Sequence, residues 1–85
     1  MSLYIFRDRV SGGYSVPICI DANDAALRRS LKKALETPSP QPQPWQVFPQ
    51  DHELYCCGEF DPDSGRLTAF DNPEFLFNIS DLMEV

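Results

Sequence analysis

The stretch Glu-Leu-Tyr-Cys-Cys-Gly-Glu-Phe-Asp-Pro-Asp-Ser-Gly-Arg-Leu-Thr-Ala-Phe, residues 53–70, decides the fold. Both of its ends are rich in aromatic, aliphatic and β-branched residues, which favour strands. Between them, Pro62 presets a turn conformation and Gly65 can adopt the positive φ that closes a chain reversal. The stretch therefore predicts a β-hairpin whose turn is Asp61-Pro62-Asp63-Ser64-Gly65. Asp71-Asn72-Pro73 predicts a break after it, and residues 74–85 are apolar enough to pack as a short helix or a strand.

The N-terminal segment predicts a second hairpin. Residues 3–7 favour a strand, and Ser11-Gly12-Gly13 favours a turn. After the turn, apolar residues alternate with other residues, as in a strand with one buried face. The residues on the apolar side are Tyr14, Val16, Ile18 and Ile20. Pro17 has no N–H to donate, so this strand is expected at an edge of the sheet.

Residues 24–36 predict an amphipathic helix. Asp21 or Asn23 can cap its first N–H groups, and Asp24 suits the first turn. Apolar residues recur at i, i+4, i+7 and i+8 and form one stripe: Leu27, Leu31, Ala34 and Leu35. The helix is expected to end at Thr37, because the residue before a proline avoids the helical conformation.

The Pro/Gln-rich segment 37–50 is expected to be a semi-rigid extended linker, since prolines occupy every second position from Pro38 to Pro44. It joins an N-terminal ββα half to the C-terminal hairpin within a single domain, residues 1–85. The predicted fold class is α+β, with two β-hairpins that form a small antiparallel sheet packed on one amphipathic helix.

Charge is unevenly distributed in this chain of 85 residues with a formal net charge of −6. Six of its seven cations lie in residues 1–36, whereas nine of its 13 acidic residues lie in residues 51–85, with only Arg66 in opposition. Such asymmetry allows a cationic face beside an acidic one. Because so short a chain has a small core, we also expect self-association into a homodimer.

The cysteines Cys19, Cys56 and Cys57 are few, odd in number and partly adjacent, which is a poor disulfide framework. No secretory leader is recognisable, so we expect reduced thiols in a cytosolic protein. Apolar runs are far shorter than the ~20 residues needed to cross a bilayer, so no membrane partner is expected.

Catalytic, metal and cofactor chemistry finds little support, so we expect no enzyme and no cofactor. His52 has no recognisable nucleophilic partner. His52, Cys56 and Cys57 lack the spacing of a zinc site, because adjacent cysteines on a strand diverge. Glu59, Asp61 and Asp63 lack the closing glutamate of a calcium loop.

Nucleic-acid binding is a functional class that the residues allow without establishing it, through a cationic helix face and nearby aromatic side chains. On the helix, four cations without interleaved acidic residues occupy the arc opposite the apolar stripe. Exposed rings beside cations suit sequence-tolerant single-strand binding. The candidate residues are Arg28, Arg29, Lys32, Lys33, Arg7, Arg9, Tyr4 and Tyr55. The alternatives are a solvated helix face and rings that belong to the core.

Three segments together resemble a known family in their order and spacing. They are residues 3–8, residues 17–29 with their Asn-Asp helix start, and Leu54-Tyr55-Cys56-Cys57-Gly58-Glu59-Phe60-Asp61 with Gly65. The chain resembles the small nonstructural protein of gokushoviruses, which are tailless single-stranded-DNA phages of the microvirus group. The Pro38–Pro44 stretch and the adjacent cysteines depart from that pattern.

The resemblance implies a phage protein outside the virion, in the cytoplasm of the infected bacterium, that binds DNA in genome synthesis or packaging. It implies no catalytic residues. The function expected is therefore sequence-independent binding of single-stranded DNA. The alternative is a non-catalytic interaction module, in which the cationic helix or the acidic C-terminal part docks on a host or viral protein.

Thiol titration of the denatured protein, purified without oxidants, is expected to count three thiols. The reason is that a reducing cytosol keeps Cys19, Cys56 and Cys57 unpaired. A count of one would mean that two cysteines form a disulfide, and it would contradict the expected compartment.

Overall fold

The computed structural model describes residues 1–21 and 23–83. The strands are β1 (Ser2–Asp8), β2 (Ile18–Ile20), β3 (His52–Asp61) and β4 (Arg66–Asn78), and the helices are α1 (Asp24–Glu36) and α2 (Pro44–Val47). Two 3₁₀ helices follow α2 and β4, at Pro49–Asp51 and Ile79–Met83. No helix in the described part of the chain has the length and apolar character required to cross a membrane.

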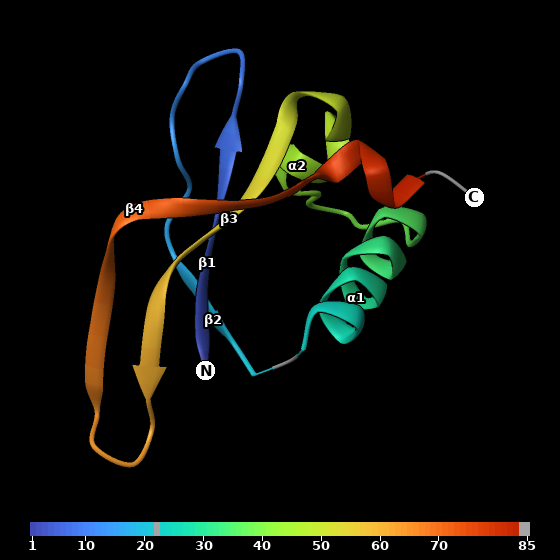
Figure 1. Ribbon diagram of the computed structural model, residues 1–85. Coiled ribbons are helices and arrows are strands. Elements are labelled where there is room, and N and C mark those ends of the chain that lie inside the picture. Colours follow the sequence, from blue (N-terminus) through green and yellow to red (C-terminus); the bar gives the residue numbers. More distant parts are fainter. Residues whose placement is uncertain (22, 84–85) are drawn as a thin grey trace.

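The four strands form one antiparallel sheet in the order β2-β1-β3-β4, and α1 covers one of its faces (Figure 1). Each hairpin pairs sequence neighbours, while β1 and β3 join the two hairpins in the middle. This arrangement confirms the predicted small α+β fold. The short strand β2 lies at the edge of the sheet, as the lack of an N–H at Pro17 led us to expect.

The predicted C-terminal hairpin forms, and its turn has the expected chemistry. Gly65 has a φ of 73° and donates its N–H to the Asp61 carbonyl at 2.8 Å. The expected break at residues 71–73 is wrong as a strand end, because β4 continues through these residues. The irregularity lies in the pairing with β3 instead. Gly58 pairs with Ala69, whereas Cys56, two residues earlier in β3, pairs with Glu74, five residues later in β4. β4 accordingly bends partway along its length (Figure 1).

β3 and β4 approach each other closely at Gly58. A Cβ atom at this position would lie 2.4 Å from the Thr68 carbonyl oxygen. Any side chain would therefore push the two backbones apart, so the hairpin requires glycine there.

The predicted alternation over residues 14–20 is wrong. Only Ile18–Ile20 forms a strand, and Tyr14 and Val16 are exposed rather than buried. The segment instead follows β1 through irregular contacts: Phe6 donates its N–H to Ser15 Oγ at 2.9 Å, and Ser15 donates its N–H to the Phe6 carbonyl at 2.8 Å. Because Pro17 cannot extend a regular ladder, residues 11–16 form a loop beside β1. At the tip of this loop Gly12 has a φ of 78°.

Helix α1 forms as its sequence predicts. Asn23 is the N-cap and its Oδ1 accepts the Ala26 N–H at 2.8 Å, while Thr37 follows the last turn. Leu27 and Leu31 are buried against the sheet. The core cluster comprises Tyr4, Phe6, Leu27, Leu31, Leu54, Phe77, Ile79 and Leu82.

The linker predicted over residues 37–50 is extended only in its first half, because residues 44–51 fold into α2 and the following 3₁₀ helix. Pro44 occupies the first turn of α2, where a proline is favourable since its missing N–H has no helical partner. Trp45 then stacks on Phe6, with ring centroids 4.9 Å apart and planes inclined by 4°. This apolar anchor binds the segment to the core.

Leu54→Ala is expected to lower the free energy of unfolding by about 3 kcal/mol, because Leu54 is fully buried and its truncation leaves a cavity. Leu67 is 65% exposed and gives the matched control: Leu67→Ala should change stability by less than about 0.5 kcal/mol. Urea denaturation followed by circular dichroism measures both values. Equal effects of the two substitutions would contradict the assignment of the core.

Candidate nucleic-acid interface

The four helix cations form a continuous cationic face, which we define as Arg28, Arg29, Lys32 and Lys33 of α1. At 3.6 residues per turn they span about 140° of the helix circumference. Arg28, Arg29 and Lys33 are exposed, and Lys32 is half-buried. In residues 1–21 and 23–83, the only ion pair is Arg7–Glu53, so the cationic face has no acidic partner there.

Arg28 does not lie on the arc opposite the core as expected. Its guanidinium carbon lies 4.1 Å from the centroid of the Phe77 ring, a cation–π contact with β4. Lys32 lines a small hollow with Leu35, Glu36, Leu82 and Met83, so its aliphatic stem packs beside the apolar stripe; Glu36 shares the hollow but forms no ion pair within 4.0 Å with a described residue. Arg29 and Lys33 are therefore the two side chains of the cationic face that point most directly into solvent.

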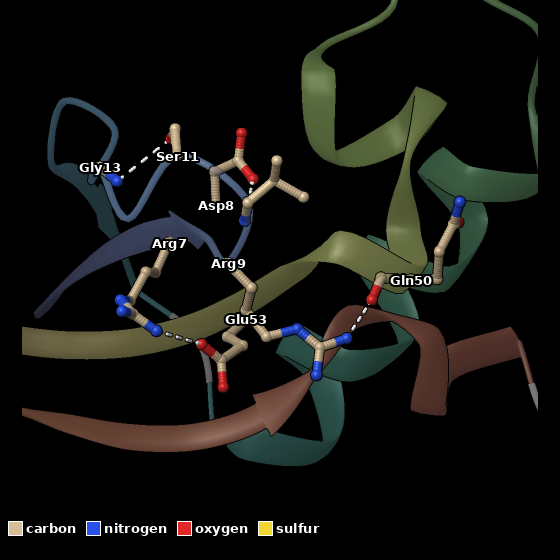
Figure 2. A network of polar contacts seen from close by, with 8 residues as sticks. Arg7, Asp8, Arg9, Ser11, Gly13, Gln50 and Glu53 are labelled. Atoms are coloured by element: carbon tan, nitrogen blue, oxygen red, sulfur yellow. Dashed lines mark hydrogen bonds and ion pairs between the residues drawn. The ribbon is translucent and has the colours of Figure 1, made fainter.

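Arg7 lies near the end of β1 and Arg9 just after it, and both take part in polar contacts with the segment that leads into β3 or with β3 itself (Figure 2). Arg7 Nη1 donates to Glu53 Oε1 at 3.1 Å, and this hydrogen bond raises the pKa of Arg7 above its ordinary value. Arg9 donates to the carbonyl of Gln50. Both guanidinium groups are thus engaged by the protein itself, and their assignment to a DNA surface has no support in the geometry.

The two predicted stacking tyrosines lie on opposite faces of the sheet. Tyr4 is a core residue, only 4% exposed, so its proposed role at the surface is wrong. Tyr55 follows the buried Leu54 and pairs with Ile5, which places it on the face away from α1. There it contacts Tyr14 and Phe75, both edge to face, with centroid separations of 5.8 and 5.6 Å.

We call Tyr14, Tyr55 and Phe75 the aromatic face. Tyr14 and Phe75 are about half exposed, at 52% and 48%. Sequence reasoning missed both residues: Tyr14 was assigned to a buried side, and Phe75 to a segment without a defined structure. The cross-strand spacing of Tyr55 and Phe75 would have identified the cluster only if the register of β3 on β4 were known.

A cavity lies on the covered face of the sheet, at the end where β1 finishes and β3 begins. It is enclosed by the 11–16 loop, α1 and α2. Asp8 and His52 face each other across β1 and β3 at its floor. Asp8 Oδ1 accepts the Val10 N–H at 2.9 Å, and this bond lowers the pKa of Asp8, which stays ionised at neutral pH. His52 is buried and its Nδ1 lies 2.8 Å from the Phe48 carbonyl oxygen. Because a carbonyl oxygen only accepts, this contact places a proton on Nδ1.

The metal-ligating arrangements considered from the sequence do not form in the described ranges, where no three His, Cys, Asp or Glu side chains could hold an ion together. Asp61 serves the hairpin turn: its Oδ1 accepts the Asp63 N–H at 3.0 Å and its Oδ2 accepts the Ser64 hydroxyl at 3.0 Å. The first of these bonds is the main cause of a lowered pKa of Asp61.

Comparison with known proteins identifies the family. The family model of the phage ORF5 protein matches residues 1–82. The chain belongs to the phage ORF5 protein family. No curated protein and no solved structure matches it. The match spans both hairpins and α1, so the cationic face and the aromatic face of this phage ORF5 protein both lie inside the family region.

Proposed function

We propose that this phage ORF5 protein is the nonstructural protein of a gokushovirus and binds single-stranded DNA without sequence preference, in genome synthesis or packaging. It acts without catalysis or a cofactor, in the cytoplasm of the infected bacterium and outside the virion. The cationic face of α1 carries the proposal, because its four side chains have no acidic partner in the part of the chain that the structure describes. Unneutralised cations on one surface favour a polyanion.

Phosphate contacts supply the affinity in this proposal. Arg29 and Lys33 project into solvent, and Arg28 can share its charge between the Phe77 ring and a phosphate. The aromatic face lies on the other side of the sheet, so a strand on α1 does not reach it without wrapping around the molecule. Binding by phosphates alone explains an absence of sequence preference.

The acidic residues of the β3–β4 hairpin limit the affinity for DNA in this proposal. Glu59, Asp61, Asp63, Asp71 and Glu74 lie on β3 and β4 or the turn between them, opposed by Arg66 alone. Their repulsion confines a strand to the surroundings of α1. We therefore propose weak binding that depends on low ionic strength.

Removing the cationic face should abolish DNA binding and leave the fold intact. The variant Arg28→Gln/Arg29→Gln/Lys32→Gln/Lys33→Gln keeps good helix propensity. Fluorescence anisotropy at low salt should show binding of a labelled mixed-sequence oligonucleotide by the unmodified protein and none by the variant. For the unmodified protein, the slope of log K against log salt should be about −3 if all four cations meet phosphates.

Arg9→Gln/Arg66→Gln is the charge control, to be compared with Arg29→Gln/Lys33→Gln. Both double variants remove two exposed cations, but only the second removes them from α1. The first should bind DNA almost as well as the unmodified protein. If both weaken binding equally, or if the unmodified protein does not bind below high micromolar concentration, the cationic face is not a DNA surface.

A second candidate function, protein interaction, is favoured by the aromatic face. Two half-exposed rings packed on Tyr55 form an apolar patch on the side of the sheet that α1 leaves uncovered. Arg7 and Glu53 lie beside it, one cation and one anion on neighbouring strands. In a two-fold interface each copy would present its Arg7 to the other's Glu53. A second copy of this chain is therefore the proposed occupant.

Light scattering after size exclusion is expected to give a dimer mass at micromolar concentration, and Phe75→Glu should give a monomer because it places a charge inside the interface. Leu67→Glu is the control, since Leu67 is also exposed on β4 but lies outside the aromatic face. A monomeric mass for the unmodified protein would remove the homodimer, and the aromatic face would then be open to a host or viral protein.

A further inference from the structure

The cavity between the covered sheet face and α2 has the size and the walls of a small-molecule site. Its volume is about 630 Å³, within the range of ligand pockets. Apolar and aromatic side chains dominate its lining. The residues used below are Asp8, Tyr14, Val16, Trp45 and His52.

One wall of the cavity is flat and held in place. Trp45 stacks on the buried Phe6, which fixes the plane of the indole ring. α2 is in turn tied to α1, because Gln46 Nε2 donates to the Ala34 carbonyl at 3.0 Å. Tyr14, on the 11–16 loop, also lines the cavity, but its ring packs against Tyr55 and is not part of this wall. A rigid aromatic wall suits a planar ring.

Asp8 supplies an acceptor at the floor. Its Oδ1 accepts the Val10 N–H, Ser11 also helps to lower the pKa of the carboxyl, and Oδ2 has no hydrogen bond of normal geometry to the described residues. His52 is 5% exposed and commits Nδ1 to the Phe48 carbonyl, and Nε2 has no hydrogen bond to the described residues. The Ser15 hydroxyl, in contrast, is already used by the Phe6 N–H and the Val16 carbonyl. The Asp8 carboxylate in a largely apolar site therefore suits a ligand with an N–H donor.

Charge excludes phosphate from the cavity. None of the lining residues that the structure describes is Lys or Arg, and Asp8 would repel an anion. The ligand is therefore not an anion, and a flat ring with an N–H donor suits both the Trp45 wall and the Asp8 carboxylate. An amino-bearing nucleobase has these properties, and a carboxylate is the group that accepts from the cytosine amino group.

We propose that this cavity binds an amino-bearing nucleobase, with its ring against Trp45 and its amino group donating to Asp8. Either a free nucleoside or one base of a single strand can supply this chemistry. The site does not depend on DNA binding by α1, because none of the four cations lines the cavity. It would favour bases that carry an amino group over those that do not, while phosphate binding elsewhere stays independent of sequence.

Cytidine and uridine are the discriminating probes, because they differ at the group that faces Asp8. Trp45 is the only tryptophan, so its fluorescence reports the site directly. Cytidine should change the fluorescence saturably, and uridine should bind at least about tenfold more weakly. Equal affinities, or no cytidine binding at millimolar concentration, would overturn the proposal.

Asp8→Asn should reverse the preference. Asparagine retains an oxygen acceptor for the Val10 N–H, but its NH₂ group replaces the free acceptor with a donor, which suits the uridine carbonyl. Cytidine binding should fall about tenfold and uridine binding should rise. A misfolded protein would lose both ligands instead, so a reversal is not a folding artefact. Asp61→Asn, the same change in the hairpin turn, should leave both affinities unaltered.

Val16→Trp provides an independent test, because Val16 lines the cavity and is 82% exposed, so a large ring fits there without disturbing the core. It should block cytidine binding, and unchanged affinity would contradict the site. Competition by oligodeoxycytidine, measured also in the quadruple glutamine variant, separates the two sources. Displacement of cytidine identifies a base of a strand, and a lack of displacement identifies a free nucleoside.

Discussion

The backbone pairing of β1 with β3 is the interaction on which the other contacts depend. It runs from Ser2↔Glu59 to Asp8↔His52 and fastens one local hairpin to the other. Without it, β2 would be held by only three residue pairs and β4 by a hairpin with interrupted pairing. The same pairing sets the two faces of the sheet. It places Phe6 beside Leu54 under α1, and Ile5 beside Tyr55 on the side that α1 leaves uncovered.

A two-sided sheet separates the groups that single-strand binding was expected to combine. Cations gather on α1, exposed rings gather on the far face, and a cavity with the Asp8 carboxylate at its floor lies at the end of the covered face. Each of these surfaces suits a different ligand: a phosphate chain, a second protein copy and a nucleobase. The family match to a phage ORF5 protein covers all three surfaces.

Local chemistry predicted the local elements well. The turn with Gly65, the Asn23 cap and the stripe with Leu27 and Leu31 were correct, because each depends on residues close in sequence. The sequence could not predict on which face of the sheet Tyr4 and Tyr55 lie. Alternation shows that neighbours point to opposite sides, but only the packing of α1 decides which side is buried.

The surroundings of the other candidate residues were not predictable for the same reason, at longer range. Engagement of Arg7 by Glu53 requires the register of two strands that lie far apart in sequence. Trp45 was treated as the end of a linker, since nothing near it indicates that Phe6 provides its stacking partner. The 11–16 loop and the cavity beside it also arise from contacts with β1 that alternation cannot reveal.

The central strand is made first, but its partner follows much later in the chain, since Asp8 pairs with His52. During synthesis, β1 and β2 can meet early, whereas the middle of the sheet must wait until β3 has emerged. Closing such a long loop lowers the chain entropy before the stabilising contacts form. Folding that depends on residue pairs far apart in sequence is therefore slow. The nascent chain therefore carries an unpaired edge on β1 until β3 has emerged, a period in which a chaperone or another copy can occupy it.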